Sequence, residues 1–120
     1  MNLECSSKGD KRFSAFYARI KKYGNRSIEE IYQNSKRDEY NRVPGKGKKV
    51  KYMFWEGKYY SPKHLSNLYS FLWKIYFEEN PSLLEYASKF DTFTDMFRGK
   101  SINCQADVIS YLVKKYKEVM

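Results

Sequence analysis

Cysteine and histidine are scarce in this sequence, which limits the metal sites and nucleophilic sites that it can build. The 120 residues include two cysteines, Cys5 and Cys104, and one histidine, His64. The two cysteines form no CxxC pair, so no zinc or iron–sulfur spacing can be assembled from this set. A Cys–His nucleophile is disfavoured too, because Cys5 is near a terminus and Cys104 begins an apolar helical segment. We expect no metal ion, no cofactor and reduced thiols.

Long apolar runs, internal repeats and low-complexity segments are also missing. The longest apolar run is far too short to cross a bilayer, and the N-terminus has no apolar segment of the kind that signal peptides carry. We therefore expect no membrane partner and a cytoplasmic protein. The short, lysine-rich chain is typical of bacteriophage proteins, in which case the location would be the host cytoplasm. A Walker phosphate loop is excluded, because Gly45-Lys-Gly-Lys lacks its spacing and its trailing Ser/Thr.

Positive charge is abundant and unevenly distributed. The net charge is +9, and residues 1–60 carry fifteen Lys or Arg against seven Asp or Glu, whereas residues 61–120 carry eight against seven. This asymmetry indicates a polyanionic partner, such as DNA, RNA or a phosphate-bearing nucleotide. Lysines that only aid solubility are the alternative. The candidate nucleic-acid contacts are the lysines of the most basic stretch: Lys46, Lys48, Lys49 and Lys51.

Residues 27–37 carry the clearest helix signal. Ser27 can cap the helix, and Glu30 follows three residues later, as in a capping box. The spacing of Ile28, Ile31, Tyr32 and Ser35 predicts a face that packs inward. A mixed polar line occupies the neighbouring face: Glu29, Gln33 and Lys36, with Arg37 beside them.

The remaining patterns predict an α+β fold, a mostly helical single domain of residues 1–120 with a small antiparallel sheet. Residues 1–12 are polar and indicate a loop over residues 6–10, residues 13–20 indicate a short strand or extended segment, and residues 91–98 a turn or short helix. Pro44, Gly45 and Gly47 place a loop over residues 38–49, and the Glu56-Gly57 turn predicts a hairpin over residues 50–60; we expect both to form an insertion. Further helices are predicted from Pro62 to about Glu79, from Pro81, and from Cys104 to Glu118.

Two motifs near the N-terminus resemble the opening of the NADAR (YbiA-like) N-glycosidase family. Phe13-Ser-x-Phe-Tyr17 and a turn are followed by Ser27-Ile-Glu29, then Gln33 and Lys36, in the family's order and spacing. The match at the C-terminal end is looser: Asp91 or Asp95, then a segment from Gly99 to Asn103. Met96-Phe97 replaces the family's Trp-Gly, and Glu30 replaces the histidine that follows the motif glutamate.

The resemblance implies a hydrolase that cleaves a ribosyl–nitrogen bond, acting on an ADP-ribosylated nucleobase such as guanine in nucleic acid, or on a related nucleotide. It implies Glu29 as the catalytic carboxylate, with Asp95 assisting. The substrate contacts that it suggests, together with the basic residue Arg12, are Ser14, Phe16, Tyr17, Gln33, Lys36 and Asn103.

Glu29 suits such a role for a physical reason. At the second position of a helix, free N–H groups and the helix dipole favour the ionised carboxylate. An ionised carboxylate can stabilise an oxocarbenium-like state and orient a water molecule, but it is a poor general acid. The alternative is that Glu29 only stabilises a helix start. Two non-enzymatic functions also remain open: a basic nucleic-acid-binding protein, and an inhibitor that binds an acidic host protein.

Overall fold

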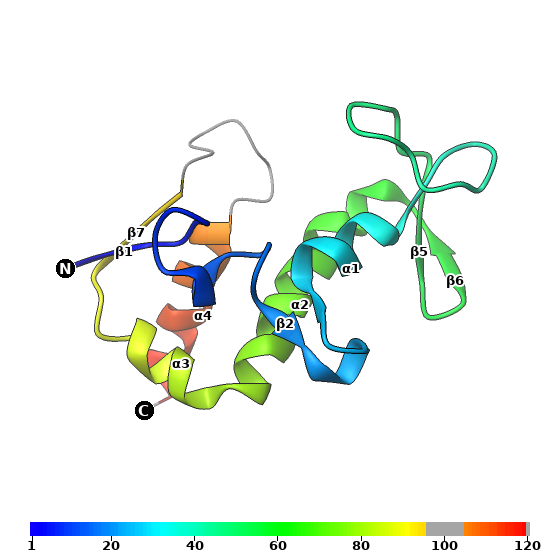
Figure 1. The fold of residues 1–120 in the computed structure, drawn as a ribbon. Helices are drawn as coiled ribbons and strands as arrows, with labels where there is room; N and C mark the ends of the chain where they lie inside the picture. The colour runs from blue at the N-terminus through cyan, green and yellow to red at the C-terminus, as the bar shows by residue number, and fades with distance from the viewer. Residues whose placement is uncertain (96–104, 120) are drawn as a thin grey trace.

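The computed structural model describes residues 1–95 and 105–119, which form a mixed α+β fold around one long helix (Figure 1). This helix, α2 (Leu65–Glu79), contacts α1 (Ile28–Asn34), α3 (Pro81–Ala87) and α4 (Gln105–Glu118). The α+β fold class with small antiparallel sheets is therefore confirmed. The strands are β1 (Asn2–Glu4), β2 (Arg19–Ile20), β3 (Arg26–Ser27), β4 (Lys36–Arg37), β5 (Tyr52–Trp55), β6 (Lys58–Tyr60) and β7 (Thr92–Thr94).

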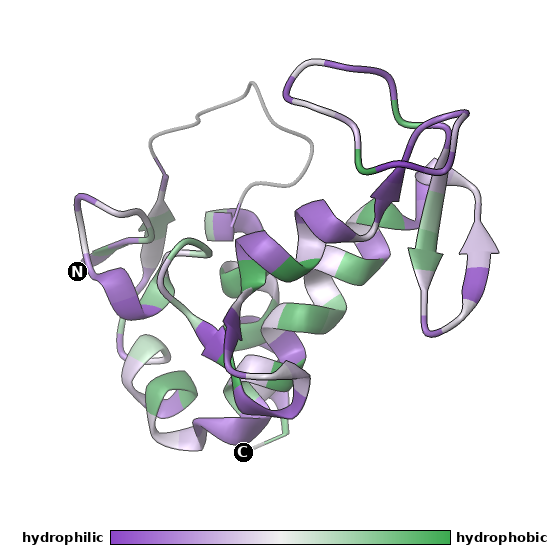
Figure 2. Cartoon of the chain, turned by 45° about the vertical axis from the view of Figure 1, so that its right-hand side comes forward, coloured by the Kyte–Doolittle hydropathy of each residue, from purple (hydrophilic) through white to green (hydrophobic). Residues whose placement is uncertain are grey.

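Helix α2 supplies the centre of the hydrophobic core. Ser61 accepts a hydrogen bond from the Lys63 N–H ahead of the short 3-10 turn Pro62–His64, and α2 ends at Glu79, before Asn80-Pro81. Both boundaries confirm the prediction. Trp73 is fully buried, with its ring centroid 5.8 Å from that of Phe77, and Phe13 lies 6.1 Å from Phe77. Figure 2 shows hydrophobic residues on the helices and mainly hydrophilic residues along the loop before β5.

Helix α1 begins as predicted but ends earlier. The Ser27 hydroxyl accepts a hydrogen bond from the Glu30 N–H at 3.1 Å, and the inward face of Ile28, Ile31, Tyr32 and Ser35 is buried. Lys36 and Arg37, predicted as helical, instead form β4. The Ser35 hydroxyl donates to the Tyr32 carbonyl at 2.6 Å, which satisfies a carbonyl of the last turn. Pairing with β5 then provides the backbone hydrogen bonds that the helix would have made.

The predicted hairpin is confirmed and extends into a three-stranded antiparallel sheet with the order β4-β5-β6. Glu56 and Gly57 at its turn have φ values of 48° and 80°. Two successive positive φ values are the signature of a type I′ turn, which matches the twist of the flanking strands. Trp55, at the end of β5, packs edge-on against Tyr23 with 5.3 Å between ring centroids.

Two predictions about the ends of the chain are wrong. Residues 2–4, within the polar stretch for which the sequence predicts no strand, form β1, and residues 92–94, predicted as a turn or short helix, form β7. The two strands pair in parallel, with Leu3 opposite Phe93, and the Cys5 N–H donates to the Thr94 carbonyl at 2.7 Å. Burial of Leu3 and Cys5 drives this pairing, and three-residue strands are too short to show a period of two.

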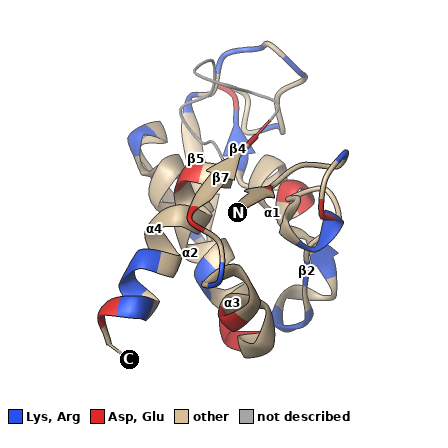
Figure 3. Ribbon diagram, turned by 90° about the vertical axis from the view of Figure 1, so that its left-hand side faces the viewer, with Lys and Arg blue, Asp and Glu red and all other residues tan. Residues whose placement is uncertain are grey.

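Basic residues gather at two places on the molecule. Figure 3 shows Lys and Arg along the loop above β4 and β5 and on the outer turns of α4. Within residues 1–95 and 105–119, no helix has the length and apolar character that a membrane span requires.

Candidate functional site

A hollow of about 480 Å³ lies between α1 and the basic loop of residues 43–50, and we call it the Glu29 hollow. It brings together six of the residues that the sequence singles out, four from the motif region and two from the basic loop. Its lining consists of Phe16, Glu29, Gln33, Lys36, Pro44, Gly45, Lys46, Gly47, Lys48 and Val50.

Glu29 is held from two sides. It is the second residue of α1, and its N–H donates to the Ala15 carbonyl at 2.9 Å. One carboxylate oxygen, Oε1, accepts a hydrogen bond from Gln33 Nε2 at 2.8 Å, one helical turn further on. No donor to the other oxygen, Oε2, appears among the residues that the structure describes. The helix start and Gln33 thus fix the orientation of a carboxylate that lines the hollow.

Lys36 reaches the same hollow from β4 rather than from the helix. Its Nζ lies 4.8 Å from the centre of the Tyr32 ring, a cation–π distance. Burial lowers the pKa of Lys36 below its ordinary value of 10.5, and the negative charge of Glu29 partly offsets that effect. The hollow therefore combines an oriented carboxylate with a cation that is weakly hydrated and available to an anionic group.

Phe16 is presented at the rim by a tight turn. Its side chain is 52% exposed, and the turn is anchored by Ser14, whose hydroxyl accepts from the Phe16 N–H at 3.4 Å. Ser14 itself is fully buried, so the structure places it beneath the turn and not in the lining. An exposed ring beside a carboxylate is suited to stacking on a planar base.

Gln105 joins the start of α4 to the same turn, and no pattern in the sequence pointed to it. Its Oε1 accepts a hydrogen bond from the Ala15 N–H at 2.6 Å, and its side chain is buried. Ala15 also accepts the hydrogen bond from the Glu29 N–H. Gln105 therefore positions the backbone that orients Glu29, although the two residues are far apart in sequence.

The other candidate substrate residues lie outside the Glu29 hollow or outside the described chain. Arg12 forms an ion pair with Asp10 at 2.6 Å and stacks over Tyr86, with 4.6 Å to the ring centroid. Tyr17 lies on the surface beneath Lys11. Asp95 is buried directly after β7. Asn103 lies outside the described residues.

A second hollow of about 700 Å³ lies on the other side of the basic loop, and we call it the outer hollow. Pro44, Gly45 and Lys48 line both hollows, so the loop is the wall between them. The remaining residues that line the outer hollow are Asp38, Glu39, Tyr40, Arg42, Val43, Lys49 and Lys51. In the described ranges, 1–95 and 105–119, no three His, Cys, Asp or Glu side chains gather where they could hold a metal ion.

Comparison with known protein families identifies the family of this chain. A family described as DarT1-associated NADAR antitoxin matches residues 35–119, more than two thirds of the sequence. No curated protein matches the chain. The matched range includes Lys36, the lysines of both hollows and α2 to α4, and begins after Glu29 and Gln33. On this match, the chain belongs to the NADAR family, in the group of DarT1-associated antitoxins.

Proposed function

We propose that this protein is an N-glycosidase that removes ADP-ribose from a nucleobase, with Glu29 as the catalytic carboxylate. The observation that carries the proposal is the convergence of Glu29, Gln33 and Lys36 with Phe16 on one hollow. Membership of the NADAR family is consistent with a glycosidase role, and the description of its group as antitoxins fits an enzyme that reverses a modification.

The chemistry requires one bond to break and one to form. The bond between ribose C1′ and the base nitrogen breaks, its electron pair leaves with the base, and C1′ acquires oxocarbenium character. The Glu29 carboxylate stabilises that positive charge and orients a water molecule, whose oxygen bonds to C1′. The base leaves as an anion and takes a proton from solvent, while Glu29 accepts one proton of the attacking water and returns it to solvent, so the products are ADP-ribose and the unmodified base.

The surrounding residues suit the other parts of such a substrate. Phe16 can stack on the base, and Lys36 can pair with the diphosphate of ADP-ribose. Gln33 is already bonded to Glu29 Oε1 at 2.8 Å and keeps the carboxylate aimed into the hollow. The candidate second carboxylate, Asp95, remains a proposal, as do Arg12, Tyr17 and Asn103 as substrate contacts.

The test is the variant Glu29→Gln, assayed by mass spectrometry for release of ADP-ribose from an ADP-ribosylated guanine oligonucleotide. The substituted amide retains an acceptor oxygen for Gln33 but loses the negative charge, so turnover falls at least about a hundredfold. The thermal midpoint and the affinity for ADP-ribose stay close to those of the parent protein.

Glu30→Gln is the matched control, because Glu30 is the next residue, is exposed and does not line the hollow. It removes the same charge from the same helix start and leaves turnover unchanged. Equal activity of Glu29→Gln and the parent protein contradicts the proposed function.

A second candidate is a nucleic-acid-binding protein without catalysis. The observation in its favour is the pair of lysine-lined hollows on either side of the basic loop. Its expected result is salt-sensitive binding of nucleic acid with no release of ADP-ribose from any modified base.

A further inference from the structure

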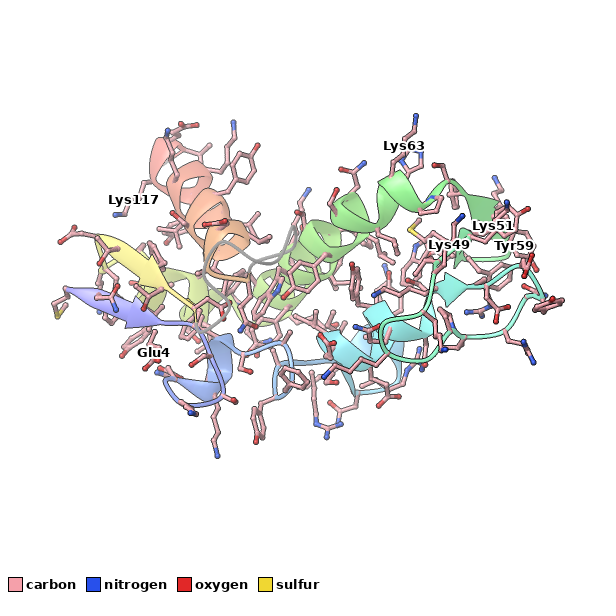
Figure 4. The ribbon with its side chains drawn as sticks, turned by 90° about the horizontal axis from the view of Figure 1, so that it is seen from above. Glu4, Lys49, Lys51, Tyr59, Lys63 and Lys117 are labelled. Atoms are coloured by element: carbon pink, nitrogen blue, oxygen red, sulfur yellow. The ribbon has the colours of Figure 1, made fainter. Side chains whose placement is uncertain are left out.

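An apolar groove of about 320 Å³ lies where α2, α3 and α4 meet, and we call it the α4 groove. It shares no described lining residue with the Glu29 hollow. Figure 4 shows Lys117, on the last turns of α4, at the opposite end of the molecule from Lys49 and Lys51 of the basic loop. The apolar lining of the groove consists of Phe77, Leu84, Leu112, Tyr116 and Val119. The proposed reaction makes no use of this groove.

Helix α4 carries two apolar faces, of which the fold buries only one. The residues of the buried face are Ala106, Ile109 and Val113. A second stripe at i, i+4, i+8 and i+11 consists of Val108, Leu112, Tyr116 and Val119. Its first three side chains are half-buried, and Val119 is 83% exposed. A helix normally buries its apolar stripes against another element, so this second stripe is only partly covered by α2 and α3.

Exposed rings extend the groove along both of the long helices. On α2, Phe71 is 38% exposed and lies one turn before Lys74, which lines the groove. On α4, Tyr111 is 58% exposed and lies one turn before Lys115, whose Nζ is 5.6 Å from the centre of the Tyr111 ring. Apolar side chains gathered within a polar rim are typical of surfaces that bind another protein.

The shape of the groove favours a helix as its occupant. The stripe from Val108 to Val119 extends for about 16 Å, or three helical turns. An open groove of this length between helices accepts a third helix, which inserts apolar side chains at i, i+3, i+4 and i+7. A small molecule is a poorer fit, because ligand pockets enclose most of the surface of the molecule that they bind.

The charges around the groove favour an acidic occupant. Lysines outnumber carboxylates on the last two turns of α4 and the adjoining face of α2: Lys74, Lys114, Lys115 and Lys117 against Glu78 and Glu118. Glu118 is itself paired with Lys115 at 3.8 Å. A second copy of this chain is disfavoured as the occupant, because each copy carries a net charge of +9 and the two repel each other. Acidic residues beside the apolar face of a partner are complementary to these lysines.

We propose that the α4 groove binds an amphipathic helix of a partner protein. The leucine-type side chains of that helix lie along Leu112, Tyr116 and Val119, and its acidic residues face Lys74 and Lys115. The proposal is independent of the glycosidase function, since the groove and the Glu29 hollow have separate linings. The Glu29 hollow therefore remains accessible while the partner helix is bound.

The probe is a displayed library of helical peptides of about four turns, with leucine fixed at i, i+3, i+4 and i+7 and all other positions randomised. Selection on the whole protein enriches peptides with Asp and Glu beside the leucines. The enriched peptide, labelled with fluorescein, then gives dissociation constants by anisotropy. A selection that enriches no peptide, or enriches basic flanks, overturns the proposal.

The apolar contact is tested with Val119→Ser, which weakens binding of the selected peptide at least about fivefold. Val119 is largely exposed, so the thermal midpoint stays that of the parent protein. Val43→Ser is the matched control, because Val43 is 49% exposed and lies in the basic loop. Equal affinities of the Val119→Ser, Val43→Ser and parent proteins contradict binding in the groove.

The charged contact is tested with an exchange of charges. Changing both Lys74 and Lys115 to Glu weakens binding of the acidic peptide at least about tenfold and strengthens binding of the same peptide with Lys in place of its acidic residues. The control changes Lys58 and Lys63 to Glu, which alters the net charge equally at exposed sites outside the groove. Equal losses in the two double variants show only the effect of net charge and overturn the proposal.

A second copy as the occupant gives a different result. Sedimentation of the protein alone then shows a dimer that Val119→Ser dissociates, and this outcome also overturns the proposal. Glu29→Gln retains full affinity for the peptide, because Glu29 does not line the α4 groove. Peptide binding without release of ADP-ribose contradicts only the glycosidase function, and release of ADP-ribose without peptide binding contradicts only the docking site.

Discussion

Among single residues, Lys36 has the largest effect on the chemistry of the Glu29 hollow. It is half-buried, its Nζ sits 4.8 Å from the Tyr32 ring centre, and it shares the hollow with Glu29. Burial lowers its pKa below 10.5. Because the charged form is disfavoured by burial, Lys36 loses its proton at a lower pH than an exposed lysine.

The pH dependence of ADP-ribose binding follows from this shift. If protonated Lys36 pairs with the diphosphate, affinity falls as the pH rises through the lowered pKa of Lys36 and is retained below it. Lys36→Arg keeps its charge throughout, so its affinity stays flat over the same range. Titration calorimetry from about pH 7 to about pH 10 measures both profiles.

Lys63→Arg is the matched control, because Lys63 is exposed and does not line the hollow. It should reproduce the profile of the parent protein. A parent profile as flat as that of Lys36→Arg would show that Lys36 does not contact the bound anion.

Helix α1 is the element on which the geometry of the candidate site depends. Its first turn carries Glu29, and the Ser27 cap holds that turn by accepting from the Glu30 N–H at 3.1 Å. A seven-residue helix is too short to be stable alone, so capping and burial of Ile28 and Ile31 must maintain it.

Ser27→Ala removes this cap and should lower the free energy of unfolding by about 1 kcal/mol. For a chain of this size, that loss lowers the thermal midpoint by about 4 °C in a calorimetric scan. Ser27→Asp restores a side-chain acceptor and should recover most of the loss. Ser82→Ala, at an exposed serine in the first turn of α3, is the control. Equal midpoints for Ser27→Ala and Ser27→Asp would contradict capping as the cause.

The pairing of β1 with β7 joins two segments that lie far apart in the sequence. Leu3 is buried opposite Phe93, and α4 packs against β7. These contacts join the N-terminal segment to the half of the molecule that carries Gln105, which in turn bonds to the turn beside Glu29. The stability of the β1–β7 end of the molecule and the geometry of the Glu29 hollow are therefore connected.

Leu3→Ala tests how much β1 contributes to the stability of the whole molecule. It leaves a cavity between β1 and the core and should reduce the free energy of unfolding by about 2–5 kcal/mol in a urea titration. Val119→Ala, at a site that is 83% exposed, should change it by less than about 0.5 kcal/mol. Similar midpoints for the two variants would show that β1 contributes little to the fold.

Features that depend on neighbouring residues could be predicted from the sequence. The Ser27 cap, the inward face of α1, the Glu56-Gly57 turn and the helical start at Ser61-Pro62, a 3-10 turn that leads into α2, all agree with the structure. Each arises from interactions within a few residues, where side-chain caps and backbone preferences dominate. That residues 38–60 form an insertion stays a prediction, and the family match runs through them.

Only the tertiary structure decided which distant residues meet. Lys36 was predicted in a helix but lies in β4, and it still lines the Glu29 hollow because the basic loop folds back over α1. The β1–β7 pair and the Gln105–Ala15 hydrogen bond at 2.6 Å join residues about ninety positions apart. Such contacts form because the free energy gained by burying apolar surface exceeds the entropic cost of closing a long loop. No local pattern of residues predicts the difference between these two terms.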